Sequence, residues 1–247
     1  MLSNLRLFIS AQIGQGAKIQ LEARDIHYLI NVMKINDKEE INIFNEHDGE
    51  WTSRIRILSK NDVYLEPISN IKKLATPSKV ILAFALLKRQ NTSLVIQKAT
   101  ELNVCEIYPI LTERTIVRNA NIEKLKLIAK EASEQCGRLD IPKIHHILDV
   151  NEVIKRNKNN NIILCDNKQK SEHILQLQEK IECKKDSVIF VGPEGGFSQA
   201  ELIYFHSLKN VFSVSLGALT LRAETAVITS LFSIQAIYNL NKIRWGK

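Results

Sequence analysis

Short segments with alternating or β-branched apolar residues dominate the first 70 residues. One segment of different period, "RDIHYLINVMK", places Ile26, Leu29, Ile30 and Met33 on one helical face. The segments typical of strands are "LRLFIS", "AKIQL", "EEINIFN", "EWTSRIRIL" and "DVYLEP". Several short strands around one small helix predict a compact β-barrel.

A different pattern begins after "NIKKLATPSK", where Pro77 and its polar neighbours predict a linker. Apolar runs then alternate with amphipathic segments, so we predict a domain over residues 1–72 and a second domain over residues 73–247. The runs "KVILAFALL", "CEIYPIL", "NIILC", "SVIFVG" and "VFSVSLG" are apolar on both faces. Such runs predict an α/β fold, with a parallel sheet covered by helices on both sides.

The amphipathic segments predict five helices in the second domain. They are Asn91–Leu102, Ile122–Cys136, Ser171–Ile181, Gln199–His206 and a long final helix, about Ala223–Leu240. The final helix is apolar on more than one side, which predicts burial against the sheet or against another subunit.

Composition excludes several classes of protein. Hydrophobic residues make up 45% and charged residues 25%, as in globular proteins. No apolar run reaches the length of a membrane span, and the first residues do not form a signal peptide, so we expect a cytoplasmic protein. The four cysteines are widely spaced and no HExxH motif occurs, so we expect no metal.

The net charge of +7 suggests an anionic partner, although solubility alone also explains it. Residues 1–77 hold as many basic as acidic side chains, so the whole excess lies after residue 77. In "SRIRIL", Arg54 and Arg56 alternate with Ile55 and Ile57, which fits either a phosphate-binding stripe or an ordinary solvated strand face.

Three predicted strand ends carry unusual sequence: "IILCDN", "GPEGG" and "SLGALTLRAETA". Ligands of open α/β sheets bind beyond the carboxyl ends of strands. Glycine allows a ligand to approach the backbone closely. We therefore expect the two glycine-containing loops to form one pocket lined by backbone groups.

Charged residues beside these loops have different explanations. Ser198 and Glu201 form an S-x-x-E capping box, so Glu201 needs no catalytic role. Glu194 lies inside "GPEGG", where an exposed turn residue and a functional carboxylate both fit. Arg222 precedes the final helix, where a cation is electrostatically disfavoured. Arg222 is therefore a candidate for holding an anionic or carbonyl group.

Four ordered motifs resemble the ribosomal RNA small subunit methyltransferase E family, of the SPOUT class. They are "KATELNVCEIYPILTERTIV", "EQCGRLDIP", "FVGPEGGFSQAEL" and "SLGALTLRAETA", and "RLFI" and "HYLINVMKI" are similar to its N-terminal segment. The resemblance implies a PUA-like N-terminal barrel and a C-terminal α/β domain with a deep trefoil knot. It also implies a homodimer that uses S-adenosylmethionine, without a metal, to methylate N3 of a uridine in 16S rRNA.

By the same resemblance, backbone groups of the knot loops would hold the cofactor. The implied cofactor-binding residues are Leu164, Cys165, Gly192, Pro193, Glu194, Gly195, Gly196, Leu216, Gly217, Leu221, Arg222, Thr225 and Ala226. Arg222 would steady the uracil anion, and Glu194 would orient the substrate or accept its proton, unless water does so.

Candidate RNA contacts come from both predicted domains. They are Arg6, Lys34, Arg54, Arg56, Lys88 and Arg89. The chain departs from the family pattern at Leu219, where an arginine is usual, and at Thr220, Asn103 and Lys34. Leu219 keeps open a non-catalytic RNA-binding assembly factor, and an enzyme binding a phosphorylated metabolite is a third alternative.

Overall fold

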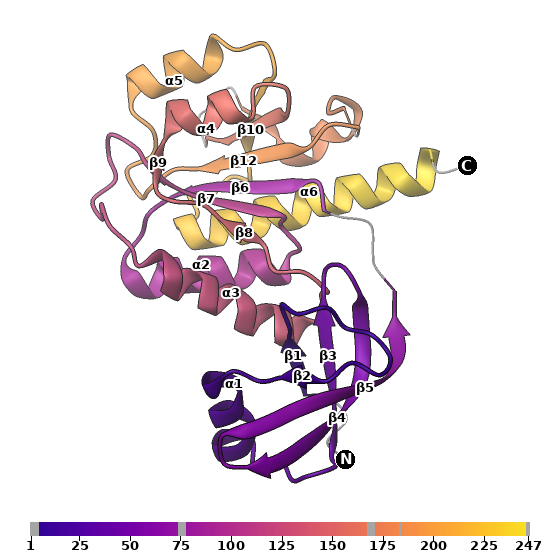
Figure 1. Ribbon diagram of the computed structural model, residues 1–247. Coiled ribbons are helices and arrows are strands. Elements are labelled where there is room, and N and C mark those ends of the chain that lie inside the picture. The colour runs from indigo at the N-terminus through magenta and orange to yellow at the C-terminus, as the bar shows by residue number, and fades with distance from the viewer. Residues whose placement is uncertain (1–4, 74–77, 167–170, 183, 246–247) are drawn as a thin grey trace. The chain divides into compact units, whose positions relative to one another are not determined.

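The computed structural model describes residues 5–73, 78–166, 171–182 and 184–245 (Figure 1). The chain divides into two compact units. Unit 1 comprises Met1–Thr76 and Ser133–Ile141, and unit 2 comprises Pro77–Ala132 and Pro142–Lys247. The domain boundaries expected from the sequence do not include the second segment of unit 1. The predicted linker residue Pro77 lies outside the described residues.

Unit 1 contains a five-stranded sheet of order β1-β3-β4-β5-β2. Its strands are β1 (Arg6–Phe8), β2 (Ile19–Gln20), β3 (Glu40–Asn45), β4 (Gly49–Ser59) and β5 (Asp62–Lys72). Each falls on a segment predicted as a strand. On β4, Arg54 is exposed and Ile55 is fully buried, as the alternation predicts.

The helical insert of unit 1 differs from the prediction at its end. Helix α1 (Ala23–His27) continues into the π-helical turn η1 (Tyr28–Val32). The wider turn changes the periodicity, because Met33 N donates to Tyr28 O five residues earlier. Met33 is 38% exposed, so its predicted place on the buried face is wrong, and Ile35 is buried instead.

Arg6 is the centre of a buried polar network in unit 1. Its Nε donates to Glu50 Oε1 at 2.7 Å and its Nη2 to Glu50 Oε2 at 3.3 Å. Its remaining N–H groups donate to three backbone oxygens, those of Ser133, Glu134 and Arg138, at 2.8, 3.1 and 2.7 Å. The guanidinium also lies 4.1 Å from the centre of the Phe44 ring.

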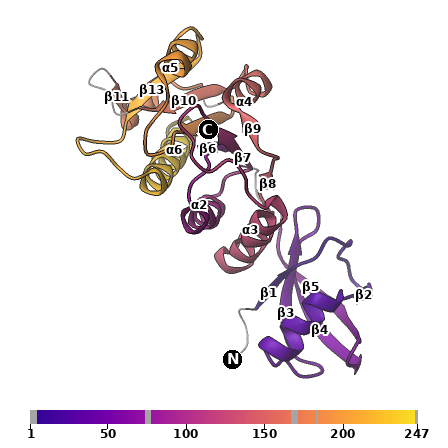
Figure 2. The same cartoon turned by 90° about the vertical axis from the view of Figure 1, so that its left-hand side faces the viewer.

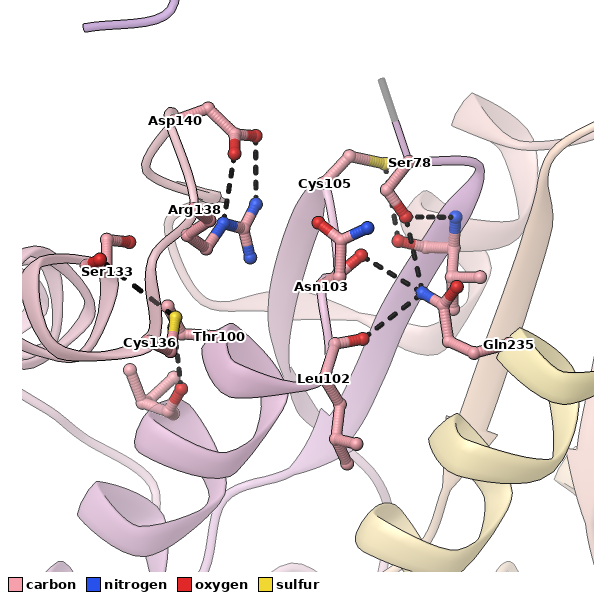
Figure 3. Close-up of polar contacts among 12 residues, drawn as sticks. Ser78, Thr100, Leu102, Asn103, Cys105, Ser133, Cys136, Arg138, Asp140 and Gln235 are labelled. Carbon is pink, nitrogen blue, oxygen red and sulfur yellow. Dashed lines mark hydrogen bonds and ion pairs between the residues drawn. The ribbon is translucent and has the colours of Figure 1, made fainter. Parts of the chain in front are cut away.

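These contacts use all five N–H donors of the arginine. Two of the acceptors, Ser133 O and Glu134 O, belong to the last turn of α3 (Ile122–Cys136), where carbonyls lack helical partners. Arg138 itself pairs with Asp140 at 2.8 Å (Figure 3). Arg6 therefore closes the end of a helix and fixes the segment after it.

Unit 2 contains an eight-stranded sheet of order β11-β13-β10-β12-β6-β7-β8, with β9 paired to β7, and every pairing is parallel. The predicted parallel strands are confirmed, whereas β8, β9 and β11 were not predicted. The strands are β6 (Val80–Ala85), β7 (Glu106–Leu111), β8 (Lys143–Ile144), β9 (Leu148–Asp149), β10 (Asn161–Cys165), β11 (Glu172–His173), β12 (Ser187–Val191) and β13 (Val211–Ser215).

Helices cover both faces of this sheet, as predicted (Figures 1 and 2). Helices α4 (Val150–Arg156) and α5 (Gln199–His206) share a core with one face, in which Phe190 packs edge-on against Phe205. On the other face lie α2 (Arg89–Glu101) and α6 (Ala223–Trp245). The buried residues of α6 include Val227, Leu231 and Ile234.

Two helical segments differ from the prediction. Ser171–Ile181 is not an α-helix, because β11 is followed by the 3₁₀ helix η2 (Ile174–Glu179). Its apolar residues Ile174 and Leu177 are three positions apart, a spacing that a 3₁₀ turn also buries. Helix α4 was not predicted. Its N-cap is Asp149, whose side chain accepts from Glu152 N at 2.8 Å.

Helix α6 is tied to the end of α2 by one amide side chain. Gln235 Nε2 donates to Leu102 O and Asn103 O, each at 3.1 Å, and to Ser78 Oγ at 3.4 Å (Figure 3). Asn103 has φ of 56°, a conformation that asparagine tolerates better than most residues. None of the helices described is long and apolar enough to cross a membrane.

We predict that Arg6→Ala destabilises the protein by about 3–5 kcal/mol, because it leaves Glu50 buried without its partner. Urea denaturation followed by circular dichroism measures the change. Arg54→Ala is the matched control, because its pair with Glu40 is about half exposed and contributes about 0–1 kcal/mol. Equal losses in the two variants would contradict a structural role for Arg6.

Candidate functional site

The carboxyl ends of three neighbouring strands meet at one edge of the parallel sheet. Strands β13, β10 and β12 end at Ser215, Cys165 and Val191, and both β13 and β12 pair with β10 in parallel. The loops that follow them are "LGALTL", the segment beginning at Asp166, and "GPEGG". Parallel pairing therefore brings together the three sequences singled out above.

Described residues at these three strand ends line a pocket of about 290 Å³ in unit 2. Its walls combine backbone of the glycine-rich loop with apolar side chains of "LGALTL" and of the strand ends. The lining residues are Cys165, Asp166, Val191, Gly192, Pro193, Glu194, Gly195, Gly196, Phe197, Val214, Leu216, Leu219, Thr220, Leu221, Ala223 and Ala226. The single pocket expected from the two glycine-containing loops is present.

Close packing at one position and backbone conformation at another favour glycine in the first loop. A Cβ on Gly192 would lie 3.1 Å from the Phe197 ring, closer than a side chain normally packs. Gly196 has φ of +66° and closes a turn, with its N–H donating to Pro193 O at 2.8 Å. In the facing loop Gly217 has φ of +134°. The loop conformation thus depends on the absence of side chains.

The capping box after this loop is confirmed. Glu201 N donates to Ser198 Oγ at 3.2 Å, and Ser198 N donates to Glu201 Oε2 at 2.7 Å. The other carboxylate oxygen, Glu201 Oε1, accepts from Glu113 N at 2.9 Å. That second contact was not predicted, and it ties the start of α5 to the loop after β7.

Nine of the thirteen implied cofactor-binding residues line the pocket: Cys165, Gly192, Pro193, Glu194, Gly195, Gly196, Leu216, Leu221 and Ala226. Four others do not line it. Leu164 is fully buried in the core shared with α4 and α5. Gly217 and Thr225 are neighbours of lining residues. Arg222 is exposed, and its carbonyl accepts from Ala226 N at the start of α6.

The lining residues missed by sequence reasoning adjoin the motifs that were found. Val191 ends β12, Val214 is the residue before the end of β13, and Phe197 follows "GPEGG". Leu219, Thr220 and Ala223 lie within "SLGALTLRAETA", and Asp166 follows Cys165. All of them lie within sequences quoted above, so the motifs located the pocket but did not separate the residues that line it from their neighbours.

The charged side chains that line the pocket are acidic. Asp166 and Glu194 supply carboxylates, whereas the described residues lining the pocket include neither lysine nor arginine. Such walls suit a ligand with a positive charge better than a phosphate. Across the described residues no group of three or more His, Cys, Asp and Glu side chains is placed to hold a metal ion.

The environment of Cys165 favours the protonated thiol at neutral pH. Burial raises its pKa to about 12, and a hydrogen bond with Ser230 opposes that rise only in part. A thiol with so high a pKa stays protonated and is a poor nucleophile. The raised pKa therefore argues against Cys165 as a nucleophile in the pocket.

Basic side chains predicted to contact RNA lie in both units. Lys88 and Arg89 are exposed and follow β6, whose parallel pairing with β12 places them at the same sheet edge as the pocket. In unit 1, Arg54 pairs with Glu40 at 2.9 Å. Arg56 lies 3.7 Å from Glu66, and a hydrogen bond with Tyr64 raises its pKa.

The other two candidates in unit 1 differ in exposure. Lys34 is exposed and has φ of 54°. Arg6 has no N–H donor left for a phosphate, because all five are used inside unit 1. We therefore assign Arg6 a structural role and leave it out of the candidate RNA surface.

Comparison with protein families gives two matches. Residues 75–235 match the family described as an RNA methyltransferase domain, and residues 21–68 match the RNA methyltransferase PUA domain. A Rickettsia conorii relative named ribosomal RNA small subunit methyltransferase E is 34% identical over 235 residues, covering 94% of this chain and 95% of that protein. A Bacillus subtilis relative of the same name is 26% identical, covering 90% and 91%.

Solved structures of similar fold include two with a bound ligand. A Legionella pneumophila methyltransferase in complex with the cofactor SAM is 27% identical with a TM-score of 0.83, covering 94% of this chain and 97% of that one. Ribosomal RNA small subunit methyltransferase E from Neisseria gonorrhoeae, bound to S-adenosyl methionine, is 24% identical with a TM-score of 0.85 and the same coverage. At 24% identity, the similarity to the Neisseria gonorrhoeae structure shows a shared fold.

We predict that iodoacetamide at pH 8 alkylates Cys136 and leaves Cys105 and Cys165 unmodified. Cys136 is exposed, whereas burial raises the pKa of both other thiols to about 12. Peptide mass spectrometry measures the modification at each cysteine, and the urea-unfolded protein, in which all four cysteines react, is the control. Alkylation of Cys165 as fast as Cys136 would overturn the assignment of an inactive thiol.

Proposed function

The chain belongs to the ribosomal RNA small subunit methyltransferase E family, and on that premise we propose that it transfers a methyl group from S-adenosylmethionine to N3 of a uridine in 16S rRNA. The observation that carries this proposal is the backbone-lined pocket between "GPEGG" and "SLGALTL" at the edge of the parallel sheet. Methylation of the small ribosomal subunit would take place in the cytoplasm.

The pocket residues fit the proposed cofactor. The volume lies near the lower end of the range for small-molecule sites, roughly 300–1,000 Å³. Leu216, Leu221 and Val191 offer apolar walls for a purine ring, and the glycine backbone offers amide and carbonyl groups to its edges. Asp166 and Glu194 complement the positive charges of a sulfonium and an ammonium group.

S-adenosylmethionine, when bound, supplies an electrophilic methyl group on its sulfonium sulfur. The residues of this chain must position the uracil ring and manage its N3 proton. Glu194 is exposed and lines the pocket, so it can orient the ring or accept the proton, and water is the other candidate base. Cys165 stays a protonated thiol and takes no part.

Arg222 is assigned to the anion that forms when N3 loses its proton. It adjoins the lining residues Leu221 and Ala223, and it immediately precedes α6. Its charge and the amide groups of the helix start both favour a negative charge in front of them. This role explains why an arginine occupies a position at which its positive charge does not stabilise α6.

Cations in each unit are the proposed contacts to RNA phosphates. Lys88 and Arg89 are exposed at the edge of unit 2. In the unit that matches the PUA domain, Lys34 and Arg54 are exposed and Arg56 is half-buried. We extend the PUA-like barrel and the knotted cofactor site of the family to this chain as part of the proposal. Phosphate contacts by such side chains position an RNA without reading its sequence.

We also propose that the protein is a homodimer. Helix α6 buries one face against the sheet, yet Phe232 and Leu240 on the same helix are 64% and 50% exposed. An aromatic side chain so exposed on a long helix suits contact with a second copy of the chain. Thr225 and Asn239, seven residues to either side of Phe232, are exposed with it.

A non-catalytic assembly factor with the same fold is the second candidate. Leu219 favours it, because the side chain lines the pocket and is 77% exposed where an arginine is usual in the family. The two functions differ in one result. The assembly factor binds undermethylated 30S particles without transferring a methyl group.

We predict that S-adenosylhomocysteine binds the protein and that Gly192→Val weakens this binding by about tenfold or more. The valine would press on the Phe197 ring and deform the pocket wall. Isothermal titration calorimetry measures the affinity. Gly14→Val is the control, because a Cβ there meets open space. If the unaltered protein fails to bind S-adenosylhomocysteine, the methyltransferase proposal is wrong.

We predict that Arg222→Ala lowers kcat/KM for methylation of undermethylated 30S particles by roughly 10²–10³-fold, with S-adenosylhomocysteine affinity retained. The loss follows from removing the charge that faces the uracil anion. Transfer of a tritiated methyl group measures it. Glu194→Gln in the same assay separates the candidate bases, because an unchanged rate assigns the proton to water.

A further inference from the structure

The loop between β7 and α3 exposes an isoleucine between two arginines. Ile116 is 88% exposed, the most exposed of the large hydrophobic side chains described. Arg114 and Arg118, two residues to either side, are also exposed. A large apolar side chain with so much exposed surface is unfavourable in water, so the exposure of Ile116 needs an explanation.

The base of this loop is firmly held. Thr112 and Thr115 are buried, and Thr112 N donates to Thr115 Oγ1 at 2.8 Å while Thr115 N donates to Thr112 O at 3.2 Å. Glu113 N donates to Glu201 Oε1 at 2.9 Å. Ile116 therefore follows directly on a fixed turn, and its exposure belongs to the ordered fold.

The loop lies at the rim of the candidate cofactor pocket. Arg114 Nη1 donates to Gly195 O at 2.7 Å, and Gly195 lines the pocket. The Cδ of Arg114 would lie 3.5 Å from a Cβ on Gly195, so the Arg114 side chain lies against the backbone of Gly195. Parallel pairing of β12 with β6 and of β6 with β7 places all three following loops at the same edge.

Charge around the loop favours an RNA partner. Lys88 and Arg89 come from the loop after β6, and Arg114 and Arg118 come from the loop after β7. The exposed carboxylates on these two loops and on "GPEGG" are Glu113 and Glu194. Cations therefore predominate at the rim, whereas the pocket itself is acidic. This separation suits a polyanion outside and a cationic ligand inside.

We propose that residues Arg114–Arg118 form an RNA wedge, in which Ile116 packs against the base stack next to the target uridine and keeps that uridine unstacked. Arg114 and Arg118 contact the phosphates on either side. This inference rests on the proposed function, and it adds the element that makes the target base accessible.

The chemistry of the target requires such an element. N3 lies on the pairing edge of uracil, so the base must leave its stack before N3 can enter a pocket. Proteins that unstack bases insert apolar side chains between them, isoleucine among these. An exposed isoleucine held on a rigid turn at the pocket rim, with cations beside it, meets that requirement.

We predict that Ile116→Ser lowers the single-turnover rate of methyl transfer to 30S particles by about tenfold or more, with unchanged affinity for S-adenosylhomocysteine. Ile116→Leu restores most of the rate, because it keeps an apolar side chain of similar volume. Ile203→Ser is the matched control, because Ile203 is 61% exposed on α5, outside the wedge.

Binding of 30S particles without cofactor tests the same surface independently of catalysis. Arg118→Ala raises the Kd. It also reduces the slope of log Kd against log salt by about 1, the contribution of one phosphate contact. If the unaltered protein transfers no methyl group, the proposed function fails, but the effect of Arg118→Ala on the Kd still tests the wedge.

Equal rates and affinities for Ile116→Ser and Ile203→Ser would falsify the wedge. A smaller particle mass for Ile116→Ser in sedimentation would assign Ile116 to contact between copies instead, which also overturns it.

Discussion

Parallel pairing of β13, β10, β12, β6 and β7 decides which loops of unit 2 can meet. Strand β12 lies in the middle of these five and is buried along its whole length. Its side chains alternate between the two faces, with Phe190 among those that pack toward α4 and α5. Because all five strands run the same way, segments separated by more than a hundred residues end at one edge. The pocket and the loop Arg114–Arg118 both depend on this alignment.

Glu201 couples the parts of that edge to one another. One of its carboxylate oxygens completes the cap of α5, and the other accepts from the backbone of Glu113. Arg114 then reaches back to Gly195 O. The glycine-rich loop, the start of α5 and the loop after β7 thus form one hydrogen-bonded assembly. A residue with an ordinary structural role in its own helix thereby helps to hold the rim of the candidate site.

Sequence patterns predicted most of the strands and both glycine-containing loops. Strands buried on two faces leave continuous apolar runs, and backbone conformations that favour glycine leave glycines at fixed positions. The capping box of Ser198 and Glu201 was legible for the same reason. Met33 was misplaced because a π turn changes the periodicity after His27. Ser171–Ile181 was misassigned because a spacing of three also suits a 3₁₀ turn. Contacts between distant segments left no local signal, so neither the bond from Glu113 to Glu201 nor the closed network around Arg6 was predicted.

The network around Arg6 has a consequence for the order in which the chain becomes structured during synthesis. Arg6 and Glu50 are made early, but the carbonyls that accept from Arg6 belong to Ser133, Glu134 and Arg138. Domains generally fold as units as they leave the ribosome. Unit 1 lacks its second segment until translation has passed residue 138. The N-terminal strands are therefore synthesised before unit 1 is complete, and the charged pair of Arg6 and Glu50 stays incompletely satisfied while Pro77–Ala132 of unit 2 is being made.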